Sequence, residues 1–186
     1  MTNLFKLTDD LNMLKFLSST ALAFFALTTS FATLAQTYPV RPIKFLVPLA
    51  AGSTADILSR TIGAELAREL GQAVVVENKA GAGGTIAMAE LARSAPDGYT
   101  IAFASQGTLV FNLSLYAKPG YDSLKDFAPI ALAGGVSNIM VVPPNSPIKS
   151  AADFAAAAKA KPGMTFSSGG SGTSHHLSGV LFGQMT

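Results

Sequence analysis

The sequence lacks cysteine, any run of basic residues and any Gly-x-Ser-x-Gly motif. The absence of cysteine excludes disulfides, a thiol nucleophile and thiolate metal sites. The net charge of +2 is spread along the chain, so nothing indicates a nucleic-acid partner. Its two histidines, His175 and His176, are neighbours whose side chains would diverge on a helix, so one metal ion would not bind both. We therefore predict no metal, no cofactor and no catalysis.

Long hydrophobic runs are also scarce, and the most evident one, Phe16–Leu27, is too short to span a bilayer. Lys15 precedes this run, and small residues up to Ala35 follow it, which is typical of an export signal. We therefore predict a secretory signal peptide over residues 1–35 rather than a membrane anchor. Acidic residues before Met13 leave the true start open between Met1 and Met13.

Strand and helix patterns alternate through the remaining chain. Their β-α-β-α-β order predicts an α/β fold with parallel strands and right-handed crossovers. The predicted strands are 43–49, 73–76, 99–104, 129–133, 139–142 and 164–168, and the predicted helices are 55–70, 86–92, 151–161 and 173–185.

Small and hydroxyl-bearing residues follow apolar strands in three places, residues 45–56, 101–108 and 165–176. A helix is predicted directly after the first and the third. Helix N-termini offer unpaired N–H groups and partial positive charge, so they bind anions well. None of the three segments contains Lys or Arg. If they converge, we expect a small anion to be held by backbone dipoles and hydroxyls.

Two further features allow alternative interpretations. Asp56 could face a ligand, but we favour a capping role with Ser53, since a carboxylate would repel an anion. The glycine-rich segment Gly81–Gly84 loosely matches a dinucleotide fingerprint. That fingerprint also requires an acidic residue about 20 positions further on, and Asp97 meets this requirement poorly because it lies in a turn. We favour a tight turn there and keep an α/β nucleotide-binding enzyme as the alternative function.

Six spaced motifs together resemble the tripartite tricarboxylate transporter substrate-binding receptors, also called the Bug family. They are Tyr-Pro-Val-Arg-Pro-Ile from residue 38, the segments 47–56, 74–84, 95–100 and 121–130, and Ser-Gly-Gly-Ser-Gly-Thr-Ser-His-His-Leu from residue 168. The resemblance implies a periplasmic-binding-protein-like fold of the Venus-flytrap type 2. It also implies a monomeric periplasmic protein that binds a small carboxylate and delivers it to a membrane permease or a sensor.

Receptors of this family have longer mature chains, so the resemblance implies that this chain is C-terminally truncated. We expect a first lobe over residues 36–138, which lacks its C-terminal return segment, and the start of a second lobe over residues 139–186.

Carried over residue by residue, the resemblance assigns ligand contacts to three loops. The predicted ligand-binding residues are Leu49, Ala50, Ala51, Gly52, Ser53, Thr54, Asp56, Ser105, Gln106, Thr108, Gly169, Gly170, Gly172, Thr173 and His176. Leu49, Ala50 and Ala51 depart from the family, which usually has an aromatic residue and prolines there, so the shape of this loop is expected to differ.

Overall fold

The computed structural model describes residues 38–161 and 163–186. Residues Pro39–Thr186 form one compact unit. The predicted signal peptide, residues 1–35, lies outside the described residues. Within the described part, no helix is both long and apolar enough to cross a membrane.

A parallel sheet of three strands organises the first half of this unit, in the order β2-β1-β3. Strand β1 (Ile43–Val47) lies between β2 (Val74–Asn78) and β3 (Thr100–Ala102). Four of the five residues of β1 are buried, as expected for a central strand covered on both faces. The predicted β-α-β-α-β order with parallel strands is confirmed.

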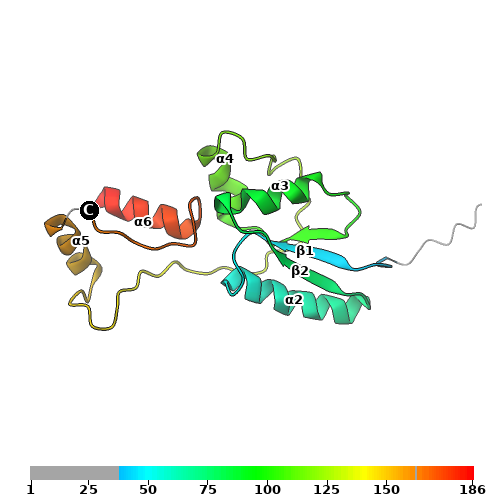
Figure 1. The fold of residues 1–186 in the computed structure, drawn as a ribbon, viewed down its shortest axis with the longest axis horizontal. Coiled ribbons are helices and arrows are strands. Elements are labelled where there is room, and N and C mark those ends of the chain that lie inside the picture. The colour runs from blue at the N-terminus through cyan, green and yellow to red at the C-terminus, as the bar shows by residue number, and fades with distance from the viewer. Residues whose placement is uncertain (1–37, 162) are drawn as a thin grey trace, which may run out of the picture. The chain divides into compact units, whose positions relative to one another are not determined.

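Two helices cover the two faces of the sheet (Figure 1). Helix α2 (Thr54–Leu70) packs against β2 and β1, whereas α3 (Thr85–Arg93) packs against β3 and β1. Helix α2 begins after the cap Ser53 and ends at Gly71, whose φ of 66° is easily adopted by glycine. The predicted boundaries of this helix are confirmed to within one residue.

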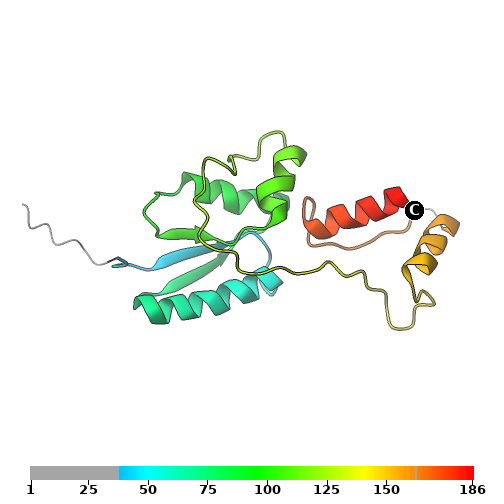
Figure 2. The ribbon, with the colours of Figure 1, turned by 180° about the vertical axis from the view of Figure 1, so that it is seen from behind.

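Five further elements follow in the described chain, and Figure 2 shows the fold from behind. They are the 3₁₀ turn η1 (Ala82–Gly84), the π-helix η2 (Gly107–Phe111), α4 (Asn112–Leu115), α5 (Ala151–Ala160) and α6 (Ser174–Met185). Helix α5 begins where predicted, with Ser150 Oγ accepting a hydrogen bond from the Asp153 amide.

The predicted strands at 129–133, 139–142 and 164–168 are wrong, because the structure has no strand there. A strand needs a hydrogen-bonded neighbour, and the sheet of the described residues ends with β2 and β3 at its edges. The apolar side chains of these segments are largely exposed, with Leu132 at 92% and Val141 at 82%. Local apolar patterning was therefore insufficient to predict pairing.

Candidate functional site

Three connections leave the carboxyl ends of the strands and meet at one edge of the sheet. Loop 1 (residues 49–54) follows β1, the glycine turn (residues 81–84) follows β2, and loop 2 (residues 105–108) follows β3. Because β2 and β3 lie on opposite sides of β1, the chain reverses direction across the sheet beside β1. Open α/β sheets bind ligands at such a switch point.

The glycine turn packs between Pro48, which precedes loop 1, and Thr108 of loop 2. A Cβ on Gly84 would lie 2.8 Å from Pro48 Cβ and 2.7 Å from Thr108 Cγ2, so only glycine fits between them. All four residues of the turn have positive φ, including Ala82 at 45°. Neighbouring protein atoms occupy the space beside the glycines of this turn, which supports a structural turn over a nucleotide-binding loop.

Loop 3 (residues 169–176) also reaches this edge. A Cβ on Gly83 would lie 2.5 Å from the Ser171 carbonyl oxygen, and one on Gly107 would lie 2.9 Å from the Gly172 carbonyl oxygen. Asn112 lies where the turn and loop 3 meet. It is fully buried, its Nδ2 donates to the Gly83 carbonyl at 2.8 Å, and a Cβ on Gly172 would contact its Oδ1.

Loop 1 is shaped by hydrogen bonds to its own helix. Ser53 Oγ accepts from the Asp56 amide at 3.3 Å, and Asp56 Oδ2 accepts from the Gly52 amide at 2.8 Å. The Ser53 amide donates to the Ala50 carbonyl at 3.2 Å. The predicted cap by Ser53 is confirmed, and the amides of Gly52 and Ser53 are already bonded within the loop.

A buried carboxylate connects loop 1 to β2. Arg60 Nη2 lies 3.0 Å from Asp56 Oδ1 and donates to Asn78 Oδ1 at 3.1 Å. Asn78 Nδ2 donates in turn to the Leu49 carbonyl at 3.1 Å. The Arg60 guanidinium, the Gly52 amide and Asn78 together lower the pKa of Asp56 from 3.8 to about 2, although burial opposes them. Asp56 therefore stays ionised.

Loop 2 closes on itself. Thr108 Oγ1 accepts from the Ser105 amide at 2.9 Å, and Ser105 Oγ accepts from the Thr108 amide at 3.4 Å. The Tyr121 hydroxyl donates to the Thr108 carbonyl from the core side. Burial raises the pKa of Tyr121, partly offset by a hydrogen bond from Asn112, so this hydroxyl stays protonated. Gln106 remains exposed at the tip of the loop.

Loop 3 repeats the capping pattern of loop 1. Thr173 Oγ1 accepts from the His176 amide at 3.3 Å and donates to the Gly170 carbonyl at 2.7 Å. In both helices the first intrahelical bonds start further along, at Ile57 and Leu177. The amides of the first two helical residues therefore lack intrahelical partners. These residues are Thr54 and Ala55 in α2, and Ser174 and His175 in α6.

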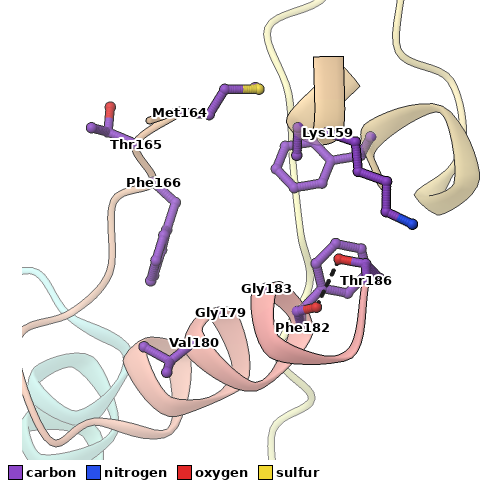
Figure 3. Close-up of a pocket in the computed structure, with 11 residues that line it drawn as sticks. Lys159, Met164, Thr165, Phe166, Gly179, Val180, Phe182, Gly183 and Thr186 are labelled. Carbon is purple, nitrogen blue, oxygen red and sulfur yellow. Dashed lines mark hydrogen bonds between the residues drawn. The ribbon is translucent and has the colours of Figure 1, made fainter. Parts of the chain in front are cut away.

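An apolar pocket of about 320 Å³ lies elsewhere, between α5, α6 and the segment around Phe166 (Figure 3). Phe154, Phe166 and Phe182 line it, and the Phe154 and Phe182 rings are 5.6 Å apart. Lys159 is the only charged residue lining it. It contains no predicted ligand residue, and its apolar lining does not suit a carboxylate.

The structure brings the predicted site residues of the three loops to one edge of the sheet, but it gives them different roles. Asp56, Thr108 and Thr173 are buried and hydrogen-bonded within the chain, whereas Ala50, Ala51 and Gly170 are exposed. No group of acidic or histidine side chains able to hold a metal occurs among residues 38–161 and 163–186.

Three residues at this edge of the sheet, Arg60, Asn78 and Asn112, are not among the predicted site residues. The spacing of Asp56 and Arg60 by four residues on one helix face was a usable signal. Asn78 pairs in register with Val47, two residues before Leu49, which becomes visible only once the strands are paired. Asn112 had no local signal, because its partner Gly83 lies 29 residues away.

Comparison with known proteins assigns the chain to a protein family. The model of the tripartite tricarboxylate transporter family receptor, TctC, matches residues 58–184. A UPF0065 protein from the tcbD-tcbE intergenic region of Pseudomonas sp. strain P51 is 39% identical, covering 84% of this chain and 47% of that protein. The protein BugT of Bordetella pertussis is 39% identical, covering 80% of this chain and 46% of BugT. The chain therefore spans about half the length of the curated relatives it matches.

Solved structures agree with this assignment. The R. palustris protein Rpa4515 with adipate is 34% identical with a TM-score of 0.76, and the periplasmic binding protein BugD is 34% identical with a TM-score of 0.69. Each match covers 80% of this chain and 50% of the other. MatC from Rhodopseudomonas palustris with bound malate has a TM-score of 0.57. The periplasmic-binding-protein-like α/β fold is confirmed, and the chain belongs to the tripartite tricarboxylate transporter receptors of the Bug family, a family of solute-binding receptors rather than enzymes.

Proposed function

We propose that this chain captures a small carboxylate in the periplasm and delivers it to a membrane permease of the tripartite tricarboxylate type. The observation that carries the proposal is the pair of capped helix starts in loops 1 and 3. Each leaves two amides without an intrahelical partner, and neither loop contains Lys or Arg. Two similarly capped helix starts suit the carboxylate group of a small ligand.

The energetics of such a site are sufficient for reversible capture. A hydrogen bond to a charged group contributes about 1.5–3 kcal/mol, so a few backbone amides can hold one carboxylate without a fixed cation. The negative charge of Asp56 opposes this only in part, because Arg60 lies against it. The protein relatives that contain adipate and malate make dicarboxylates of four to six carbons the natural first probes.

The test is a titration of ¹⁵N-labelled protein, without the predicted signal peptide, followed by amide NMR. We expect adipate or malate to shift the amides of Thr54, Ala55, Ser174 and His175 in a saturable manner. The uncharged analogue 1,6-hexanediol should leave them unchanged. ATP, which probes the nucleotide alternative, should leave the amides of Gly81–Gly84 unchanged. The proposal would be overturned by a folded protein in which neither adipate nor malate shifts the amide signals of these loops.

Export to the periplasm belongs to the same proposal and rests on the sequence of residues 1–35 and on the periplasmic relatives. Mass spectrometry of the protein from a periplasmic extract should find Gln36 at the N-terminus. Soluble protein that retains Met1 would contradict export by this segment.

A further inference from the structure

We propose that Asp56, Arg60 and Asn78 form a positioning network that fixes loop 1, so that the amides of Thr54 and Ala55 are presented before any ligand arrives. The inference rests on the proposed function for its role in binding. Its structural content, a loop fixed in the ligand-free protein, can be tested separately.

The contacts form a closed path around loop 1. It runs from the Leu49 carbonyl to Asn78, from Asn78 to Arg60, from Arg60 to Asp56, and from Asp56 to the Gly52 amide. Every distance along the path lies between 2.8 and 3.1 Å. The start and the middle of the loop are therefore held by side chains outside it, Asn78 from the sheet and Asp56 from α2.

Burial makes this path restrictive. The side chain of Asp56 is only 6% exposed, whereas that of Arg60 is 54% exposed. A buried carboxylate needs its oxygens paired, because an unpaired buried charge is costly. Asp56 Oδ2 accepts from the Gly52 amide, whereas Oδ1 accepts no hydrogen bond within the described residues and is paired with Arg60 at 3.0 Å. The buried charge is therefore compensated only while loop 1 keeps the Gly52 amide in place and Arg60 stays over Oδ1.

The loop itself explains why an external network is required. Loop 1 contains no proline, and its first half consists of Leu49, Ala50 and Ala51. Ala50 and Ala51 are exposed, and a Cβ on Gly52 would meet no atom within 4 Å. Loop 1 thus has little packing of its own, and proline would have restricted its backbone directly. The three side chains supply that restriction.

The network also assigns Asp56 a role different from ligand contact. Its Oδ2 accepts a hydrogen bond from the Gly52 amide of loop 1, and its Oδ1 is paired with Arg60. The carboxylate therefore interacts with groups of the protein itself. Asp56, Arg60 and Asn78 are positioning residues, which act on the ligand through the backbone of loop 1.

The experiment measures amide hydrogen exchange in the ligand-free protein, in the wild type and in Arg60→Met and Asn78→Ala. Arg68→Met is the matched control, since Arg68 lies on the same helix and pairs only with exposed Glu65 and Glu69. We expect the Gly52 amide to exchange at least tenfold faster in both network variants and at the wild-type rate in the control. Arg60→Lys should recover part of the protection, because it restores the positive charge but not the planar guanidinium that contacts both Asp56 and Asn78.

Titration with adipate then separates the two proposals. If loop 1 loosens in Arg60→Met and adipate binding weakens with it, both are supported. If loop 1 loosens in the variants but adipate does not bind even to the wild type, the network is supported and the proposed function is refuted. Unchanged Gly52 exchange in both Arg60→Met and Asn78→Ala would overturn the network, whatever the adipate result.

Discussion

Loops 1 and 3 use the same cap but differ in the residue that stands third in the helix. In loop 1 that residue is Asp56, whose carboxylate turns back to the Gly52 amide and is paired with Arg60. In loop 3 it is His176, and the first turn of α6 contains no acidic residue. The positive end of α2 is therefore partly compensated by the protein, whereas that of α6 is not. Loop 1 is built for fixed geometry, and loop 3 retains more of its attraction for an anion.

The two loops also differ in how they contact the sheet. Loop 1 is held by side-chain hydrogen bonds, whereas loop 3 is held by the close approach of its backbone to Gly83 and Gly107. Close backbone approach tolerates no added atoms, while a hydrogen-bonded loop has space around it.

The largest effect is expected from Gly83→Ala. The added methyl group would lie 2.5 Å from the Ser171 carbonyl oxygen, at a φ of 64° that strains any side chain. We expect the free energy of unfolding to fall by about 3 kcal/mol, since left-handed strain costs about 1–2 and overpacking about 1–3 kcal/mol. Urea unfolding followed by circular dichroism measures it.

Gly52→Ala is the matched control in loop 1. Its φ of 80° brings similar strain, but the methyl group would meet no atom within 4 Å. We expect a loss of only about 1 kcal/mol. Equal losses in the two variants would show that loop 3 does not press on the glycine turn.

The next effect concerns Asn112→Ala, which leaves the Gly83 carbonyl without its side-chain donor. Loss of a partner by a buried polar group costs about 1–3 kcal/mol, so we expect a decrease near 2 kcal/mol in urea unfolding. Asn138→Ala is the control, because Asn138 bonds Ser178 and Ser174 at an exposed position. A loss in Asn138→Ala as large as in Asn112→Ala would refute the role of burial.

A smaller effect should separate the two caps. Loss of an N-cap side chain costs about 1 kcal/mol, and we expect this full loss for Thr173→Ala, because Thr173 also bonds Gly170. Ser53→Ala should cost less, since Asp56 still holds the Gly52 amide. Local amide exchange in the first turns of α2 and α6 reports each loss. The control Thr173→Ser keeps the hydroxyl and should preserve the protection of α6. A larger loss in Ser53→Ala than in Thr173→Ala would contradict the prediction that Asp56 supports the cap of α2.

A separate effect is the response of loop 1 to acid. The folded pKa of Asp56, about 2, lies below the ordinary 3.8, so its stabilising contribution is present above 3.8 and is lost as the pH falls toward 2. Carboxyl ¹³C NMR should show this low pKa, and Arg60→Met should raise it.

Asp153 in α5 provides an internal control for that titration. The Lys149 amide, followed by Ser150, lowers its pKa by contacts that Arg60 does not share. The pKa of Asp153 should therefore be unchanged in Arg60→Met. If both carboxyl groups shift together, the effect of the substitution is general and the Asp56–Arg60 pair is not its cause.

Local signals predicted some parts of the molecule and not others. Ser53 and Gly71 marked the ends of α2 because caps depend on neighbouring residues alone. The segments 129–133 and 139–142 had the apolar pattern of strands, but pairing depends on a neighbour that residues 38–161 and 163–186 do not provide. Local capping could likewise suggest that Asp56 faces inward, but not that Asn78 completes its network, since that requires the strand register.

The pairing of Val47 with Asn78 has a consequence for the order of folding events. The bond from Asn78 to Leu49 spans 29 residues, so it cannot form until β2 has docked in register beside β1. Bringing residues 49 and 78 together costs chain entropy before their contact is gained, so such non-local contacts form late and slowly. Helix α2 and its Ser53 cap can form earlier, because their bonds are local. Loop 1 should therefore be among the last parts of the sheet edge to reach its native conformation during refolding.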